Sequence, residues 1–145
     1  MSIKGTCRLL FALICAASIA QTSLAAPAPA PSLVGYWYGL GEPNDPGTYY
    51  IDWFHADGRF SAEYRKCDKG KVVFKQTAAG TWKLAKDVLT INVTLSDGKP
   101  TRWDQVYTME SLTPTEFQAR YQENDFLFIE IRIPTFDFPA CYVIF

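Results

Sequence analysis

The chain has 145 residues, of which 48% are hydrophobic, and a formal net charge of −1. A chain of this length is expected to form one domain that is large enough to bury its own core. A chain without excess positive charge lacks the basic surface that neutralises nucleic-acid phosphates, so we expect no nucleic-acid partner.

Residues 1–25 have the features of a secretory signal peptide. Lys4 and Arg8 provide a basic start, residues 9–20 are apolar, and the small residues of Ser-Leu-Ala at 23–25 precede the expected cleavage site. An apolar run of about 12 residues is too short for a stable membrane anchor. We therefore expect a periplasmic or secreted protein that does not span the membrane. A lipoprotein acylated at Cys15 is the alternative, but Ile14 stands where a lipoprotein signal needs a small residue.

Residues 26–32 alternate alanine with proline and are predicted to form an extended linker. The remaining residues, 33–145, form one predicted domain with apolar residues at every second position. This alternation predicts strands and no helix. The predicted strands are Leu33–Leu40, Thr48–His55, Arg59–Cys67, Val72–Ala79, Thr81–Ala85, Val88–Leu95, Thr101–Ser111, Glu116–Gln122 and Phe126–Ile133.

Short turn signals such as Asp57-Gly58 and Asp97-Gly98 separate these strands. The sequence therefore predicts an all-β fold, an antiparallel up-and-down meander of 8–10 strands that closes into a barrel, because closure removes the exposed sheet edges. Gly80 lies between two of the predicted strands, where a bulge would let one long strand bend.

Two cysteines, Cys67 and Cys141, remain after signal cleavage. In an oxidising compartment a single disulfide is the expected state, and two buried thiols are the alternative. Two cysteines and the one histidine, His55, are fewer than the four ligands of a structural zinc site. We expect neither a metal nor another cofactor.

Several motifs resemble those of lipocalins. Gly35-Tyr36-Trp37 is similar to their first-strand motif, and "FHADGRF" with "GTWKLAKDVLTI" resembles bacterial lipocalin-like domains. This resemblance implies a small calycin-type barrel in which Trp37 closes one end beneath an arginine from a late strand, Arg132 or Arg120. It also implies that a Cys67–Cys141 bridge ties the C-terminal tail to a strand in the middle of the barrel.

Two predicted strands carry apolar side chains on both faces. In the strand at 48–55, Tyr49, Ile51, Trp53 and His55 alternate with Tyr50, Asp52 and Phe54, and the strand at 126–133 has the same ambiguity. Such a strand needs cover on its outer face. We predict that the C-terminal tail folds back over the barrel, held at Cys141.

The interior has three interpretations: a solid aromatic core, a cavity for a small ligand, and a core whose surplus rings form a patch that binds a protein. Asp52 would be a buried carboxylate and a site candidate if its face points inward. The candidate ligand-binding residues are Trp53, Asp52, Tyr64, Trp82, Trp103, Tyr107 and Tyr121.

We expect the protein to bind a small apolar or amphipathic molecule rather than to be an enzyme. His55 is predicted to lie at the surface at a hairpin end, with Ser61 among its possible serine partners, and no nucleophile motif surrounds these serines. Glu130 and Arg132 are predicted to form a surface ion pair. The alternative is an envelope interaction module or inhibitor, because residues 64–70 resemble a strand of lysozyme inhibitors.

Overall fold

The computed structural model describes residues 31–42 and 45–141. The predicted signal peptide and most of the predicted linker lie outside the described residues, as do the last four residues of the predicted domain.

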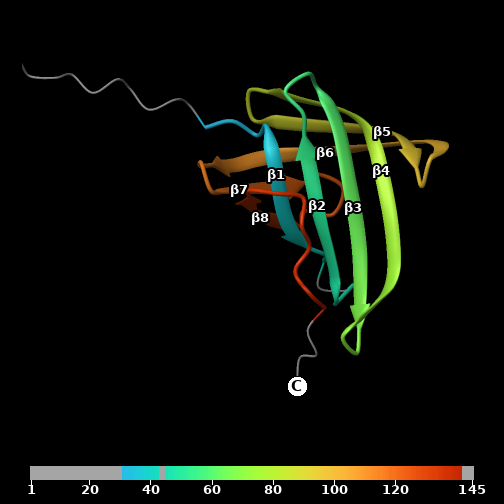
Figure 1. Cartoon of the computed structure of the whole chain (residues 1–145). Helices are drawn as coiled ribbons and strands as arrows, with labels where there is room; N and C mark the ends of the chain where they lie inside the picture. Colours follow the sequence, from blue (N-terminus) through green and yellow to red (C-terminus); the bar gives the residue numbers. More distant parts are fainter. Residues whose placement is uncertain (1–30, 43–44, 142–145) are drawn as a thin grey trace, which may run out of the picture.

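Eight antiparallel strands form one closed barrel (Figure 1). Each strand pairs with the next, and β8 returns to pair with β1, where Trp37 lies opposite Arg132. The strands are β1 Gly35–Leu40, β2 Thr48–Phe54, β3 Arg59–Asp68, β4 Lys71–Ala85, β5 Val88–Ser96, β6 Lys99–Leu112, β7 Glu116–Tyr121 and β8 Leu127–Ile133. The predicted all-β meander is confirmed. Within residues 31–42 and 45–141, no helix of the length and hydropathy of a membrane span is found.

The number of strands is eight rather than nine because two predicted strands form the single long strand β4. The register between β4 and β5 shifts between Ala79 and Gly80, as a bulge requires. A Cβ atom at Gly80 would overlap the backbone carbonyl of Asn92, so this position needs glycine for the close approach of two strands. The bend predicted at Gly80 is therefore confirmed.

One end of the barrel is closed by a packed apolar core around Trp37. The Trp37 side chain is fully buried, its indole N–H donates to the Leu33 carbonyl at 2.6 Å, and its ring meets Phe117 edge-on at 4.9 Å. The other core residues with less than 5% exposure are Phe54, Phe60, Ala62, Ala78, Leu89, Ile91, Val93 and Ala119. The described side chains at this end leave a void of only about 10 Å³ among them, which is too small for a ligand.

Arg132 covers Trp37 at the closed end and binds the surrounding backbone. Its guanidinium lies 4.1 Å from the centre of the Trp37 ring and donates to the backbone carbonyls of Ser32, Val34 and Pro114. Arg132 therefore has the place that the resemblance to lipocalins implies. Arg120, the other arginine considered for it, pairs with Glu110 instead.

Replacing Arg132 by alanine should lower the free energy of unfolding by about 2–4 kcal/mol, because three carbonyls lose a charged donor in one step. The matched variant Arg132→Lys keeps the charge but lacks the planar fork of donors, and we expect it to recover less than half of the loss. Urea denaturation at pH 7 measures both variants. A midpoint for Arg132→Ala equal to that of the wild type would contradict this role.

The C-terminal tail crosses the outside of the barrel, as predicted. Phe136 meets the ring of Tyr36 on β1 at 5.9 Å, and Arg65 on β3 lies 4.0 Å from the centre of the Phe138 ring. The tail then reaches its disulfide to β3, with 5.6 Å between the two cysteine Cα atoms. In Figure 1 the red tail passes in front of β1 and β2.

The tail covers β2 rather than β8. Ile51 on the outer face of β2 is fully buried, whereas Ile129 and Ile131 on the outer face of β8 are 50% and 48% exposed. A tail held at the end of β3 crosses β1 and β2 on its way and leaves the middle of β8 uncovered. Of the two strands that are apolar on both faces, only β2 therefore receives cover.

Candidate functional site

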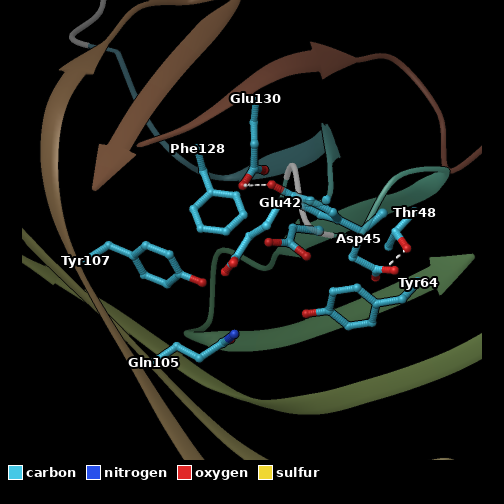
Figure 2. Close-up of a pocket in the computed structure, with 11 residues that line it drawn as sticks. Glu42, Asp45, Thr48, Tyr64, Gln105, Tyr107, Phe128 and Glu130 are labelled. Atoms are coloured by element: carbon cyan, nitrogen blue, oxygen red, sulfur yellow. Dashed lines mark hydrogen bonds between the residues drawn. The ribbon is translucent and has the colours of Figure 1, made fainter. Parts of the chain in front are cut away.

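The end of the barrel opposite the packed core holds a cavity of about 270 Å³ (Figure 2). This volume is near the lower end of the roughly 300–1,000 Å³ usual for small-molecule pockets. The lining residues are Gly41, Glu42, Asp45, Thr48, Tyr50, Asp52, Tyr64, Gln105, Tyr107, Phe128 and Glu130.

Strand alternation brings these side chains to the inside of the barrel. Tyr50 and Asp52 come from β2, Glu130 comes from β8 on the other side of β1, and Tyr107 comes from β6 in the opposite wall. The loop between β1 and β2 adds residues at the rim. In Figure 2, Glu130 and Phe128 point into the cavity from one wall, and the Tyr64 and Tyr107 hydroxyl groups point toward its centre.

Two buried carboxyl groups form the floor of the cavity. Asp52 and Glu130 are only 6% and 5% exposed, and both also line a second void of about 10 Å³ toward the apolar core. Among the residues that the structure describes, Asp52 Oδ1 and Glu130 Oε2 have no hydrogen-bond partner, while the Tyr50 hydroxyl donates to Glu130 Oε1 at 3.2 Å. Unpartnered buried carboxylate oxygens are costly, which makes this floor unusual for a purely structural core.

Burial changes the protonation of this pair. Loss of solvent raises the pKa of Asp52 to about 8. Burial, followed by the nearby charge of Asp52, raises the pKa of Glu130 well above its usual range, although the hydrogen bond from Tyr50 acts in the opposite direction. The floor therefore retains protons at neutral pH that exposed carboxyl groups would lose.

The tyrosines of the wall stay neutral. Burial raises the pKa of Tyr50, Tyr64 and Tyr107 well above the usual phenol value, and the charges of Asp52 and Glu130 raise it further. Their hydroxyl groups are therefore available to donate and accept hydrogen bonds. The wall combines apolar ring faces with a few polar groups.

The rim adds negative charge that is only partly compensated. Asp45 pairs with Lys66 at 2.5 Å, and this hydrogen bond lowers the pKa of Asp45. Glu42 accepts a hydrogen bond from the neutral amide of Asn124 at 2.8 Å. Among the described residues that line the cavity, none carries a positive charge. The cavity is therefore acidic as well as aromatic.

Gly39 makes the contact between Tyr50 and Glu130 possible. Gly39 lies on β1, between Tyr50 on β2 and Glu130 on β8, and is the direct pairing partner of Tyr50. A Cβ atom at Gly39 would overlap the Tyr50 ring. Glycine therefore lets this ring lie across β1, so that its hydroxyl group reaches a carboxylate two strands away.

Three of the seven predicted ligand-binding residues, Asp52, Tyr64 and Tyr107, line the cavity. Trp82 and Trp103 pack against the apolar core instead. The Tyr121 hydroxyl pairs with Glu123 in an exposed position. The alternation along the strands correctly places Trp82 and Trp103 on the inner face of the barrel. It does not say at which depth along the barrel axis each ring lies.

Trp53, one of the candidate ligand-binding residues, does not line the cavity. Its ring lies outside, where it stacks on His55 at 3.6 Å and meets Tyr36 at 5.0 Å. Because Asp52 is inward, alternation turns its neighbour Trp53 outward. Cover by the tail is what allows rings on both faces of β2.

The predicted surface pair of Glu130 and Arg132 is also wrong. Glu130 is buried at the cavity floor, and Arg132 lies at the closed end, bound to backbone carbonyls. Sequence reasoning missed Tyr50, Phe128 and Glu130 as wall residues. The signal available for them was their alternation with apolar positions, which places Phe128 and Glu130 on the same face of β8.

The single histidine is at the closed end, away from the carboxyl pair. Its imidazole Nε2 lies 3.2 Å from the Ser61 hydroxyl, and Trp53 covers one face of the ring. His55 is only 9% exposed, so the predicted surface position is wrong. Asp57 pairs with Arg59, and no carboxylate bonds to His55 in the described part of the chain. The part of the chain that the structure describes also holds no group of three or more His, Cys, Asp or Glu side chains that could bind a metal ion.

Comparison of the sequence with protein-family models and with curated proteins finds no match. The fold and the geometry of the cavity are therefore the basis for assigning a function. Both describe a barrel that is packed at one end and open at the other, with its unsatisfied polar groups at the bottom of the opening.

Proposed function

We propose that the protein is an exported lipocalin-like barrel that binds one small amphipathic molecule in its open end and catalyses no reaction. The cavity of about 270 Å³ that reaches two buried carboxyl groups carries this proposal. An eight-stranded barrel is wide enough to hold one small ligand only where side chains leave a void. The stack of Arg132 on Trp37 at the closed end supports the likeness to lipocalins.

The wall of the cavity supports an amphipathic ligand. Tyr50, Tyr64, Tyr107 and Phe128 present apolar ring faces, and the hydroxyl and carboxyl groups are few and deep. Such a combination is usual for sites that orient a ligand by one polar end. The alternative of an interaction module with a solid core has less support, because the core is packed at one end only.

Export is supported by the disulfide and by the predicted signal peptide. A bridge between Cys67 and Cys141 persists in oxidising compartments and is rare in the cytosol of most cells. Ligand capture in the periplasm or outside the cell is the corresponding role.

Filling the cavity tests the proposal. In Gln105→Trp an indole would occupy the cavity, whereas the control Arg102→Trp places the same indole on the exposed outer face of β6. The ligands tested are small aryl-alkyl molecules with a neutral, an anionic or a cationic head group. Calorimetry measures the affinity of each variant for them. We expect at least one to bind the wild type and Arg102→Trp alike, and to bind Gln105→Trp at least about tenfold more weakly. Absence of binding by every head-group class, or equal binding to Gln105→Trp, would contradict the proposal.

A further inference from the structure

We propose that the ligand carries a protonated amine, which binds at the cavity floor between Asp52 and Glu130 while its apolar body lies against the aromatic wall. This inference rests on the proposed function and specifies the class of molecule that enters the site. The class is an organic ammonium ion with N–H groups and a short, ring-bearing or apolar tail.

The floor needs hydrogen-bond donors that the described wall does not supply. Asp52 Oδ1 and Glu130 Oε2 come from strands on opposite sides of β1, and neither has a hydrogen-bond partner within residues 31–42 and 45–141. The Tyr50 hydroxyl already donates to the other oxygen of Glu130. An ammonium group has several N–H bonds directed apart, so one such group is able to donate to both carboxylates.

The described lining also favours a cationic ligand over an anionic one. No described lining residue is cationic, and Lys66, at the rim, is paired with Asp45. An anionic ligand would meet three acidic side chains, Asp52, Glu130 and Glu42, and would oppose the ionisation of the first two. A bare metal ion is not favoured, because the described residues offer no cluster of three ligating side chains. An organic cation remains.

The wall around the floor suits a cation with an apolar body. The Tyr50 ring lies 5.8 Å from that of Tyr64 and 6.3 Å from that of Phe128, and Phe128 lies 5.9 Å from Tyr107. The four rings thus form a continuous aromatic surface. Ring faces attract an ammonium ion through their quadrupole and provide apolar area for the rest of the molecule.

Binding of an ammonium ion should release protons from the floor. Burial raises the pKa of both carboxyl groups, so the site without ligand is largely protonated, and a bound cation favours the ionised forms. The other titratable groups that face the floor are the neutral phenols of Tyr50, Tyr64 and Tyr107. Those toward the rim are Glu42, Asp45 with Lys66, and Tyr121. Affinity should therefore rise with pH until the amine itself loses its proton near pH ~10.

The experiment compares three probes of similar shape at pH 8 by isothermal titration calorimetry: phenethylamine, 2-phenylethanol and 3-phenylpropanoate. We expect phenethylamine to bind at least about 100-fold more tightly than the alcohol, since its N–H groups form charge-assisted hydrogen bonds. Its dissociation constant should fall about tenfold per pH unit between pH 6 and pH 8 for each proton released. Titrations in two buffers with different ionisation enthalpies count these protons.

Variants of the floor test whether Asp52 and Glu130 cause the preference for the amine. Asp52→Asn and Glu130→Gln should each weaken phenethylamine binding by at least about 30-fold and reduce proton release, with little change for 2-phenylethanol. The control Glu63→Gln removes a buried carboxylate that pairs with Arg65 and Lys75 outside the cavity, and it should leave all three affinities unchanged.

Equal or weaker binding of phenethylamine than of 2-phenylethanol would overturn the inference. If the alcohol or the acid binds and Gln105→Trp blocks it while the amine does not bind, the ammonium site is wrong and the proposed function stands. If no probe of any class binds, both fail.

Discussion

Chemical denaturation should show a protein that is more stable at pH 5 than at pH 8, by about 3 kcal/mol or more. The cause is Asp52, whose pKa is raised from 3.8 in a solvated chain to about 8 in the folded protein. Between these two values the folded state holds a proton that the unfolded state has lost. The contribution of this proton to the free energy of unfolding is fully present below pH 3.8 and is lost as the pH rises toward 8. Glu130, with its pKa raised well above 4.5, acts in the same direction.

The variant Asp52→Asn isolates this effect from other titrating groups. The lowered pKa of His55 works in the opposite direction, because the folded state binds fewer protons there. The asparagine side chain has no proton to lose, so the variant should flatten the dependence between pH 5 and pH 8 and be more stable than the wild type at pH 8. The control Glu63→Gln should leave that slope unchanged, since the lowered pKa of Glu63 confines its contribution to more acidic solutions. A wild-type stability that rises from pH 5 to pH 8 would contradict the prediction.

Removing the disulfide should cost about 4 kcal/mol and lower the melting temperature by roughly 15 °C. The cysteines are separated by 74 positions, so the bridge closes a long loop in the unfolded chain. The double variant Cys67→Ser, Cys141→Ser also frees the tail, whose Phe136 and Phe138 pack on Tyr36 and Arg65. Differential scanning calorimetry measures the change.

Reduction of the wild type by dithiothreitol is the matched control, and it should reproduce the melting temperature of the double variant. Binding of small molecules should survive in both samples below the lowered melting temperature, because the tail lies outside the barrel and the cavity inside. A loss below about 1 kcal/mol would show that the bridge does not constrain the unfolded chain as expected.

The fold could be predicted because its local signals agree with one another. Period-two alternation from residue 33 onward gives the strands, and hairpin residues with positive φ mark the turns, as at Lys69-Gly70 and Asp97-Gly98. Gly80 was recognisable as a bend between two strand-like runs. Short hairpins between successive strands then leave closure of the barrel as the simplest way to protect both edges.

The cavity was harder to predict because alternation defines a face but not a depth. Asp52, Tyr64 and Trp82 were all candidates for the interior, and only the register between strands separates the open end from the packed end. Trp53 was misplaced because both faces of β2 carry rings, and only the path of the tail decides which face is covered. Glu130 was missed because a charged residue two positions from an arginine favours a surface pair, whereas Arg132 is used by the backbone at the closed end.

Nuclear magnetic resonance of the side-chain carboxyl carbons tests the central claim most directly. Protein labelled with ¹³C is titrated from pH 4 to pH 10, with Asp52→Asn and Glu130→Gln used to assign the two resonances. The structure predicts that the Asp52 carboxyl titrates with a pKa of about 8 and that the Glu130 carboxyl also stays protonated far above the usual range. Two carboxyl groups that are ionised by pH 5 would contradict the buried, unsatisfied floor on which the ligand assignment depends.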